Sequence, residues 1–310
     1  MVFHPPVQIV AKAGDAGKYK TGLPAWNMLL RGFMAGAYIA MGGALATVCS
    51  TGIAYTAAAS GNVTAAQALA AAQSLVPNVA NGFASAGIAN LVLGATFPVG
   101  LIIIVLTGAE LFTGDAMLAP MAAFIHKITW GKVLNLWIWV YIGNLIGSIW
   151  YAYLMAYGPF SSWNAAGAAT VTAFGTRAIA IAIAKTSYVG AAANWSCFLK
   201  AIGCNWLVNL AILLGICADD LIGKFFGIWF PIMAFVSSGF EHSIANMYFI
   251  PAGIFTQGFL DPKLVNANLN WVTMWTQNLI VVTIGNIVGA MFFVGVIYWV
   301  AFRKEIAALK

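Results

Sequence analysis

The chain has 310 residues, of which 62% are hydrophobic and only 7% are charged, and its formal net charge is +6. These proportions exclude a water-soluble fold, because so few charged residues cannot cover the surface of a globule of this size. Four stretches that contain no Asp, Glu, Lys or Arg each match or exceed the roughly 20 residues that an α-helix needs to cross a bilayer. They cover 32–109, 133–176, 201–218 and 264–302.

The hydrophobic runs predict an all-α membrane protein with six transmembrane helices in one pore domain, which covers 27–304. Residues 1–26 precede this domain as an N-terminal segment, and 305–310 form a tail. Two less hydrophobic stretches, 51–83 and 158–196, are expected to be insertions outside the membrane. The predicted spans are, in chain order, 27–50, 84–124, 133–157, 197–218, 225–256 and 271–302.

The basic residues are divided unevenly between the two ends of these spans. Most of them fall in the N-terminal segment, in the loops at 126–132 and 219–224, and in the tail. The positive-inside rule then predicts a multi-pass protein of the cell membrane with both termini in the cytoplasm. We interpret the net positive charge as this topology signal and expect no nucleic-acid partner.

An internal repeat relates the two halves of the chain. A Phe-Pro pair, a glutamate inside an apolar span, and an I-G-N-x-x-G segment follow one another twice. A unit of three spans that is repeated once must reverse its direction, so the repeat predicts inverted topology, with the second and fifth spans broken near the midplane. The matching segments are Phe97-Pro98 with Phe230-Pro231, Glu110 with Glu241, and Ile142–Gly147 with Ile284–Gly289.

One histidine stands out by its position. His242 is the only one of the three histidines that falls inside an apolar stretch, and it follows Glu241 directly. A lone buried histidine is usually a core residue, but a neighbouring carboxylate in a broken span favours function. Imidazole has an unperturbed proton affinity near neutrality, so it can lend a proton or a hydrogen bond. We therefore predict that His242 lies on the transport path.

Two loop segments carry a family resemblance. Gly108–Gly114 (GAELFTG) and Gly239–Met247 (GFEHSIANM) resemble the two signature loops of the formate/nitrite transporter family. The paired I-G-N-x-x-G segments and Ile128–Gly131 agree with it, and the resemblance extends from about residue 18 to 304. It implies an aquaporin-like fold of six spans, usually a homopentamer with a pore in each protomer.

The same resemblance implies a substrate class. Members of this family move small monovalent anions of weak acids, and the stretch 113–118 looks most like the formate transporters of formate-using anaerobes. We therefore expect formate transport across the lipid bilayer, by a channel or with a proton, and no enzymatic activity. Nitrite and hydrosulfide are the alternatives within the family.

The resemblance also assigns roles along the path. Thr113 is expected to contact and orient His242, since its hydroxyl can donate or accept a hydrogen bond. Lys185 matches a vestibule lysine that attracts anions, with Asn205 as its polar partner. Apolar constrictions would strip water from an anion at high cost, so passage as the neutral acid with a proton donor inside is expected. The expected constriction residues are Leu101, Leu111 and Phe112 on the cytoplasmic side and Phe97 and Phe235 on the outer side.

The remaining polar residues near the breaks are interpreted as structural supports. A carboxylate at a broken span can accept hydrogen bonds from the free N–H groups of the helix that follows, which is the role expected for Glu110 and Glu241. A direct part in proton relay is the alternative for both. Asn144, Asn286 and Asn246 are expected to brace exposed backbone.

Two other functional classes can be weighed from the sequence. A water or polyol channel requires paired Asn-Pro-Ala loops, and this tripeptide does not occur. A haem-bearing subunit of a redox enzyme typically has two axial histidines per haem, but only His242 lies deep in a span. The four cysteines form no C-x-x-C pair, so we expect buried thiols, no metal site and no cofactor.

Overall fold

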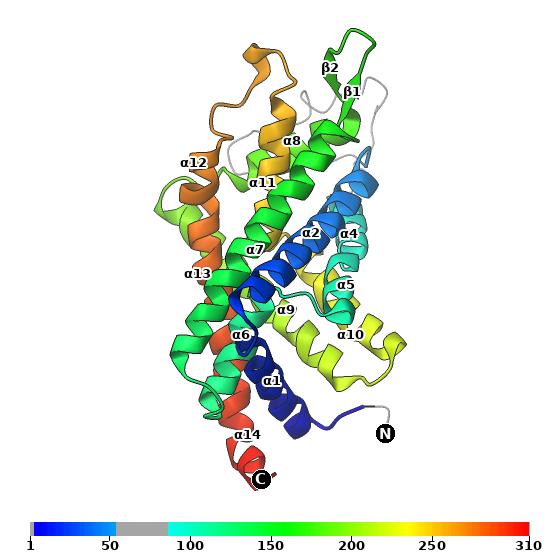
Figure 1. The fold of residues 1–310 in the computed structure, drawn as a ribbon. Coiled ribbons are helices and arrows are strands. Elements are labelled where there is room, and N and C mark those ends of the chain that lie inside the picture. The colour runs from blue at the N-terminus through cyan, green and yellow to red at the C-terminus, as the bar shows by residue number, and fades with distance from the viewer. Residues whose placement is uncertain (1–2, 54–85, 310) are drawn as a thin grey trace.

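The computed structural model describes residues 3–53 and 86–309. Most of the predicted 51–83 insertion lies outside the described residues. Within the described part the chain is built almost entirely from helices, and the longest of them run between the two ends of an elongated molecule (Figure 1). Both termini lie at one of these ends, and the short β-hairpin lies at the other.

The elements follow the predicted order with two additions, the first of which is helix α1 in the predicted N-terminal segment. The stretch 158–196 contains a hairpin of two antiparallel strands and helix α8, where the sequence predicted only a long loop. The helices are α1 (Pro6–Thr21), α2 (Ala25–Ser50), α4 (Ala86–Thr96), α5 (Val99–Thr107), α6 (Phe112–Phe124), α7 (Trp130–Tyr157), α8 (Ala173–Lys185), α9 (Ala191–Cys217), α10 (Leu221–Ser237), α11 (Ser243–Gln257), α12 (Trp271–Met274), α13 (Ile280–Ala290) and α14 (Ile297–Ala308). The strands are β1 (Ser161–Trp163) and β2 (Ala169–Val171), and η2 (Pro262–Leu264) is a 3₁₀ turn.

Five helical segments of the described chain are long and apolar enough to cross a membrane. They are Ala25–Ser50, Gly87–Thr107, Trp130–Tyr157, Ala191–Cys217 and Trp271–Ala308, and α10 is apolar but shorter. The last segment contains two π-helical stretches, η3 (Trp275–Leu279) and η4 (Met291–Val296). It continues to Ala308, so most of the predicted tail at 305–310 belongs to a helix.

Helix is interrupted at two matching places. The segment 108–111 separates α5 from α6, and 238–242 separates α10 from α11. Each interruption contains a glycine with a left-handed backbone, Gly108 with φ of 76° and Gly239 with φ of 69°. Glycine adopts this conformation without steric cost and commonly ends helices. The two glycines therefore turn the chain out of α5 and α10 just ahead of Glu110 and Glu241.

The glycines of the I-G-N-x-x-G segments allow close helix packing. A side chain at Gly147 would collide with the carbonyl oxygen of Phe33, which places the backbone of α7 directly against α2. Gly289 on α13 lies in the same way against the carbonyl of Ile202 on α9. Small residues are the usual means by which membrane helices bring their backbones together. The motif thus fixes one helix pair in each half.

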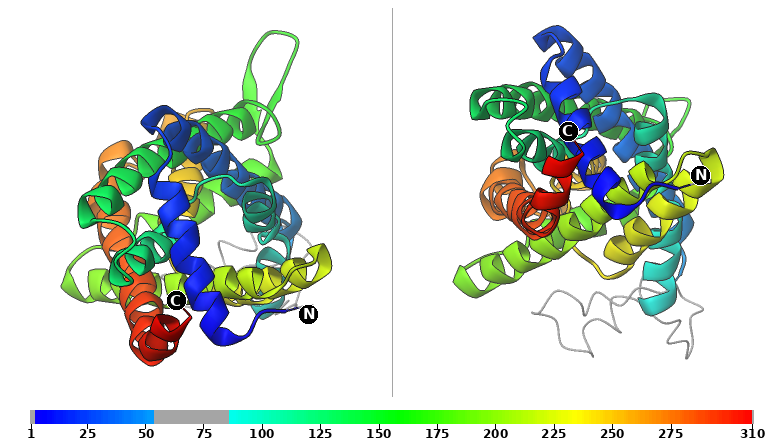
Figure 2. Two further views of the ribbon diagram at one scale, coloured as in Figure 1. Left: turned by 60° about the horizontal axis from the view of Figure 1, so that its bottom comes forward. Right: turned by 90° about the horizontal axis from the view of Figure 1, so that it is seen from below.

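Helix α1 lies across the end of the molecule that holds the termini (Figure 2). The Lys127 ammonium pairs with Asp15 on this helix, and His4 Nε2 lies 2.6 Å from Asp219 Oδ1. These contacts connect the N-terminal segment to the loops around 127 and 219. The regions that the charge pattern assigned to one side of the membrane therefore lie together in the structure.

Candidate functional site

Two asparagines hold the chain at the helix interruptions in the same way. Asn144 Oδ1 accepts a hydrogen bond from Phe112 N at 3.0 Å, and Asn286 Oδ1 accepts one from Ser243 N at 2.8 Å. Asn144 Nδ2 donates to the carbonyl oxygens of Gly32 and Glu110, at 2.8 and 2.9 Å. Because the first N–H groups of a helix have no partner within it, each amide supplies what α6 or α11 needs at its start.

The partners of Asn286 complete the match between the halves. Its Nδ2 donates to the carbonyl oxygens of Ala201 and Glu241, at 2.8 and 2.9 Å. Each asparagine thus joins a long helix (α2 or α9), the interruption, and the start of the helix that follows the interruption (α6 or α11). Both amides are fully buried. Because water cannot reach them, these bonds satisfy polar groups that would otherwise have no partner.

Glu110 and Glu241 have a different role from the one expected. Within the described residues their carboxylates bind cationic and amide groups, and no backbone N–H of α6 or α11 donates to them. The asparagines already occupy the place at the helix starts. The interpretation of the two glutamates as acceptors for free N–H groups is therefore wrong, and each buried carboxylate instead pairs with a partly exposed lysine.

We call Lys20, Arg31, Glu110 and Asp115 the α1 cluster. The Lys20 ammonium contacts the Glu110 carboxylate and lies 3.1 Å from Asp115 Oδ1. Arg31 Nη1 lies 3.6 Å from Glu110 Oε1. Both carboxylates are almost completely buried, whereas the lysine and arginine side chains keep 17% and 27% of their surface exposed. The cations therefore cover two buried carboxylates.

We call Lys185, Lys200, Glu241 and Asn246 the α8 cluster. Lys185 Nζ donates to Glu241 Oε1 at 2.7 Å, and Asn246 Nδ2 donates to Glu241 Oε2 at 2.7 Å. The Tyr188 hydroxyl donates to Glu241 Oε1 at 2.8 Å and accepts from Lys200 Nζ at 3.2 Å. This cluster holds one buried carboxylate, two lysines and neutral donors.

His242 and Thr113 meet between the two halves. Thr113 Oγ1 lies 2.9 Å from His242 Nε2, and both residues are buried. The backbone N–H of Ala245 donates to His242 Nδ1 at 3.0 Å. A backbone N–H can only donate, so Nδ1 must carry a lone pair and the ring hydrogen of the neutral tautomer sits on Nε2. His242 therefore donates to the Thr113 hydroxyl.

Four of the five expected constriction residues line a small cavity beside His242. Phe97, Leu101, Leu111 and Phe235 line it, together with Ile39, Val208 and Ile232. The Phe235 ring stacks on the His242 imidazole, with ring centres 5.8 Å apart, and packs edge-on against Phe97. Phe112 is directed elsewhere, with its ring against Trp137 and Tyr141 on α7.

Asn205 takes part in this site in another way than expected. Its Nδ2 donates to the carbonyl oxygens of Thr113 and Asn286, at 3.1 and 2.7 Å. Asn209 Nδ2 donates to the same Thr113 carbonyl at 3.1 Å. Lys185 is bonded to Glu241 instead. The predicted pairing of Lys185 with Asn205 is therefore wrong: the two asparagines hold Thr113 in place.

Sequence reasoning missed Lys20, Asp115, Asn209 and Asn278. Asn278 accepts from Asn246 Nδ2 at 2.8 Å and donates to the Lys185 carbonyl oxygen at 2.9 Å. Asn278 and Asn209 are polar residues in apolar spans, which is a signal that the sequence offers. Lys20 offers none, because nothing in an N-terminal lysine indicates a partner 90 positions away.

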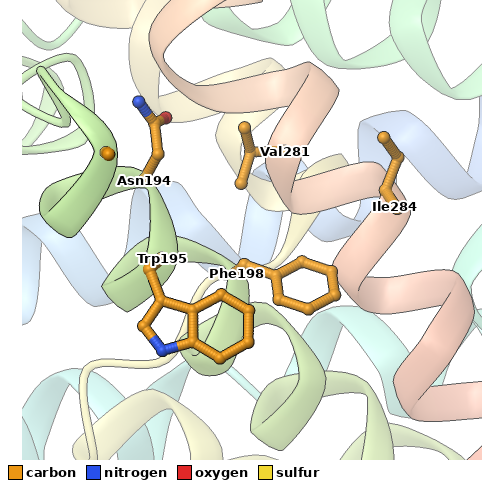
Figure 3. Close-up of a pocket in the computed structure, with 6 residues that line it drawn as sticks. Asn194, Trp195, Phe198, Val281 and Ile284 are labelled. Carbon is orange, nitrogen blue, oxygen red and sulfur yellow. The ribbon is translucent and has the colours of Figure 1, made fainter.

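A larger cavity, of about 340 Å³, lies away from these residues. It opens between α9 and the last long helical segment, and apolar side chains form most of its wall (Figure 3). Its residues are Ala191, Asn194, Trp195, Phe198, Val281 and Ile284. It holds no charged group, so it offers nothing that would recognise a polar substrate.

Comparison with known proteins agrees with this architecture. The family model described as formate/nitrite transporter matches residues 7–300. A probable formate transporter of Methanothermobacter thermautotrophicus is 36% identical and is covered over 98% of both chains. The formate channel BtFdhC of Bacillus thuringiensis is 34% identical over the whole of both chains, and the formate channel FocA of Escherichia coli is 35% identical over 71% of this chain and 76% of its own.

Solved structures show the same fold. A structure described as an FNT family ion channel has a TM-score of 0.72 and 25% identity, and it covers 95% of this chain and 98% of its own. A pentameric formate channel with formate bound has a TM-score of 0.67 and 31% identity, and covers 90% and 98%. The chain is therefore a multi-pass membrane protein that belongs to the formate/nitrite transporter family.

Proposed function

We propose that this protein transports formate across the cell membrane, through an apolar passage at His242. The observation that carries the proposal is the buried Thr113–His242 hydrogen bond beside a cavity with apolar walls, with a lysine cluster towards each end of the molecule. Relatives over the full chain length are named as formate transporters or channels. Nitrite or hydrosulfide is the alternative substrate within the family.

The proposed architecture has six transmembrane spans in an inverted repeat. In this view α4, α5 and α6 form the broken second span, and α10 and α11 form the broken fifth span. The matching bonds of Asn144 and Asn286 support a shared design for the two halves. We further propose cytoplasmic termini, as the basic residues at their end favour. A homopentamer without enzymatic activity is proposed because one similar structure is a pentameric formate channel.

The proposed mechanism must offset the hydration free energy that an anion loses when it leaves water and enters a passage with apolar walls. Removing water from a carboxylate without a compensating partner is expensive, so the ion must be attracted to the mouth and then neutralised or bonded inside. Lys20 and Lys185 each keep part of their side chain exposed while bound to a buried carboxylate. Both can therefore attract formate without being free charges in the protein interior.

Inside the cavity the neutral imidazole sets the direction of the hydrogen bonds. His242 donates to Thr113 Oγ1, so the Thr113 hydroxyl keeps its own hydrogen for another acceptor. A formate oxygen is such an acceptor. An imidazolium would present N–H to N–H at Ala245, so this geometry opposes a charged ring. We propose that formate accepts a hydrogen bond from Thr113, and that any accompanying proton enters with it from water.

The proposal is tested by flux into proteoliposomes. Formate, nitrite, hydrosulfide, acetate and lactate are compared at several pH values, with protein-free vesicles as the control. We expect formate to move fastest and larger acids to be excluded by the Phe97–Phe235 contact. Formate flux no faster than in the protein-free vesicles would refute the proposal. Faster flux of nitrite or hydrosulfide than of formate would favour the alternative.

A further inference from the structure

The two clusters match in kind. Each contains a buried glutamate from a helix interruption, a lysine from the end of a short helix (α1 or α8), and a second basic side chain from the long helix that follows it (α2 or α9). A tyrosine completes each set. The Arg31 guanidinium lies over the Tyr19 ring and the Lys200 ammonium lies over the Tyr188 ring.

One position breaks the match. Asp115 and Asn246 occupy corresponding places, five residues after Glu110 and Glu241. Asn246 is neutral, and its amide donates to the Glu241 carboxylate. As a carboxylate, Asp115 has no proton to donate, and among the described residues neither its Oδ1 nor its Oδ2 has a hydrogen-bond partner. Lys20, 3.1 Å from Asp115 Oδ1, holds this second carboxylate in place.

The exchange of an amide for a carboxylate changes the local charge. In the α1 cluster two cations face two carboxylates, so their charges balance. In the α8 cluster Lys185 and Lys200 face Glu241 alone, which leaves one positive charge. Burial by itself would lower the pKa of the Lys20 ammonium, but Asp115 and Glu110 outweigh burial and raise that pKa above its ordinary value. Lys20 is therefore charged, and the charges of the cluster balance where Asp115 is ionised.

Other charged side chains lie at both ends, and they are exposed or partly exposed. They include Lys12, Lys18, Lys132, Arg303 and Lys304 near the termini and Arg177 and Lys263 at the other end. Near α1, Lys127 is paired with Asp15, and His4 with Asp219. These groups are more exposed than the cluster carboxylates, so water and salt screen them more strongly. The part of the chain that the structure leaves undescribed at 54–85 contains no charged residue. Buried groups next to the passage therefore dominate the field that an entering anion meets.

We propose that Asp115 makes the two mouths unequal, by cancelling at the α1 end the positive charge that captures anions at the α8 end. The inference rests on the proposed transport of formate. A mouth with one net positive charge raises the local anion concentration. Saturation should thus occur at lower formate concentration from the α8 end than from the α1 end. The gradient still sets the direction of net flow.

The test compares KM from the two ends. Protein is reconstituted in one orientation, which is checked by the accessibility of a tag at one terminus, and formate flux is measured both ways at equal pH and zero membrane potential. We expect the wild-type KM to be several-fold lower from the α8 end. Asp115→Asn should lower the KM from the α1 end to about the same value. Asn246→Asp should raise the KM from the α8 end.

Controls separate this effect from folding and from surface charge. Asp115→Asn keeps the shape of the side chain, and its oligomeric state in detergent is compared with that of the wild type. Asp15→Asn removes a carboxylate from the same helix that carries Lys20, but from an exposed position, and should leave both KM values unchanged.

Two results would overturn the inference while leaving formate transport intact. One is an equal wild-type KM from both ends. The other is a folded Asp115→Asn protein with unchanged KM at the α1 end. A wild-type protein that moves no formate would refute the proposed function and this inference with it.

Discussion

The two helix interruptions share a scaffold but differ in chemistry. Asn144 and Asn286 make the same bonds to backbone on either side of them. The residues after the two glutamates have no such likeness, since Leu111 corresponds to His242 and Thr113 to Ile244. Each half supplies one member of the Thr113–His242 pair. The backbone support is thus alike in the two halves, while the side chains at the proposed passage differ.

The largest expected effect comes from removing a buried counter-ion. Glu241→Ala leaves Lys185 without its carboxylate, and breaking a buried pair in this way typically costs about 3–5 kcal/mol. We expect a sharply lower yield of folded oligomer, measured by size-exclusion chromatography after detergent extraction. Glu110→Ala should do the same at the other interruption. A Glu241→Ala protein with wild-type stability but no transport would instead support the proton-relay role.

The shared scaffold can be broken at either asparagine. Asn286→Ala strands Ser243 N and two carbonyl oxygens in a buried site, at roughly 1–3 kcal/mol for each unsatisfied group. Asn144→Ala strands the corresponding groups around Phe112. We expect both variants to lose thermal stability to a similar degree, as measured by the temperature of oligomer loss. Unequal losses would show that the two asparagines contribute differently to the stability of the protein.

The repeat could be predicted from the sequence, but helix α8 and the partners of the two glutamates could not. The paired I-G-N-x-x-G segments predicted that the two halves repeat, and the structure places both segments in close contacts, of α7 with α2 and of α13 with α9. Helix α8 was missed, since it is short and lies between stretches that read as loop. The role of the glutamates was misjudged because Lys20 and Lys185 come from outside the predicted spans, and contacts over such separations leave no local pattern.

The Thr113–His242 pair allows the difference in chemistry between the two interruptions to be tested. His242→Phe removes the donor to Thr113, and Thr113→Val removes its acceptor with little change in shape. We expect both variants to fold and to transport formate more slowly, with an altered pH profile. Because the two residues share one bond, the double variant should be no slower than the slower single variant. Thr113→Ser should retain most of the flux.

Equal flux and an unchanged pH profile in His242→Phe, at matched protein levels, would remove the histidine from the mechanism. Additive losses in the double variant would show that the two side chains act on formate separately. Either result would mean that the hydrogen bond between the halves serves packing alone.

The smallest expected effect concerns Lys185, the cation of the α8 cluster that keeps part of its surface exposed. Lys185→Ala should raise the KM for formate from that end, and added salt should shrink the difference, since charges are screened over about 8 Å at physiological ionic strength. The Glu241 carboxylate would still accept hydrogen bonds from Tyr188 and Asn246, so most of the protein should fold.

Lys185→Arg should preserve the KM for formate if the positive charge is what matters. A guanidinium has a different shape, so a loss in Lys185→Arg as large as in Lys185→Ala would show that the fit to Glu241 is the essential feature. An unchanged KM in Lys185→Ala, measured at low salt, would restrict this lysine to holding Glu241.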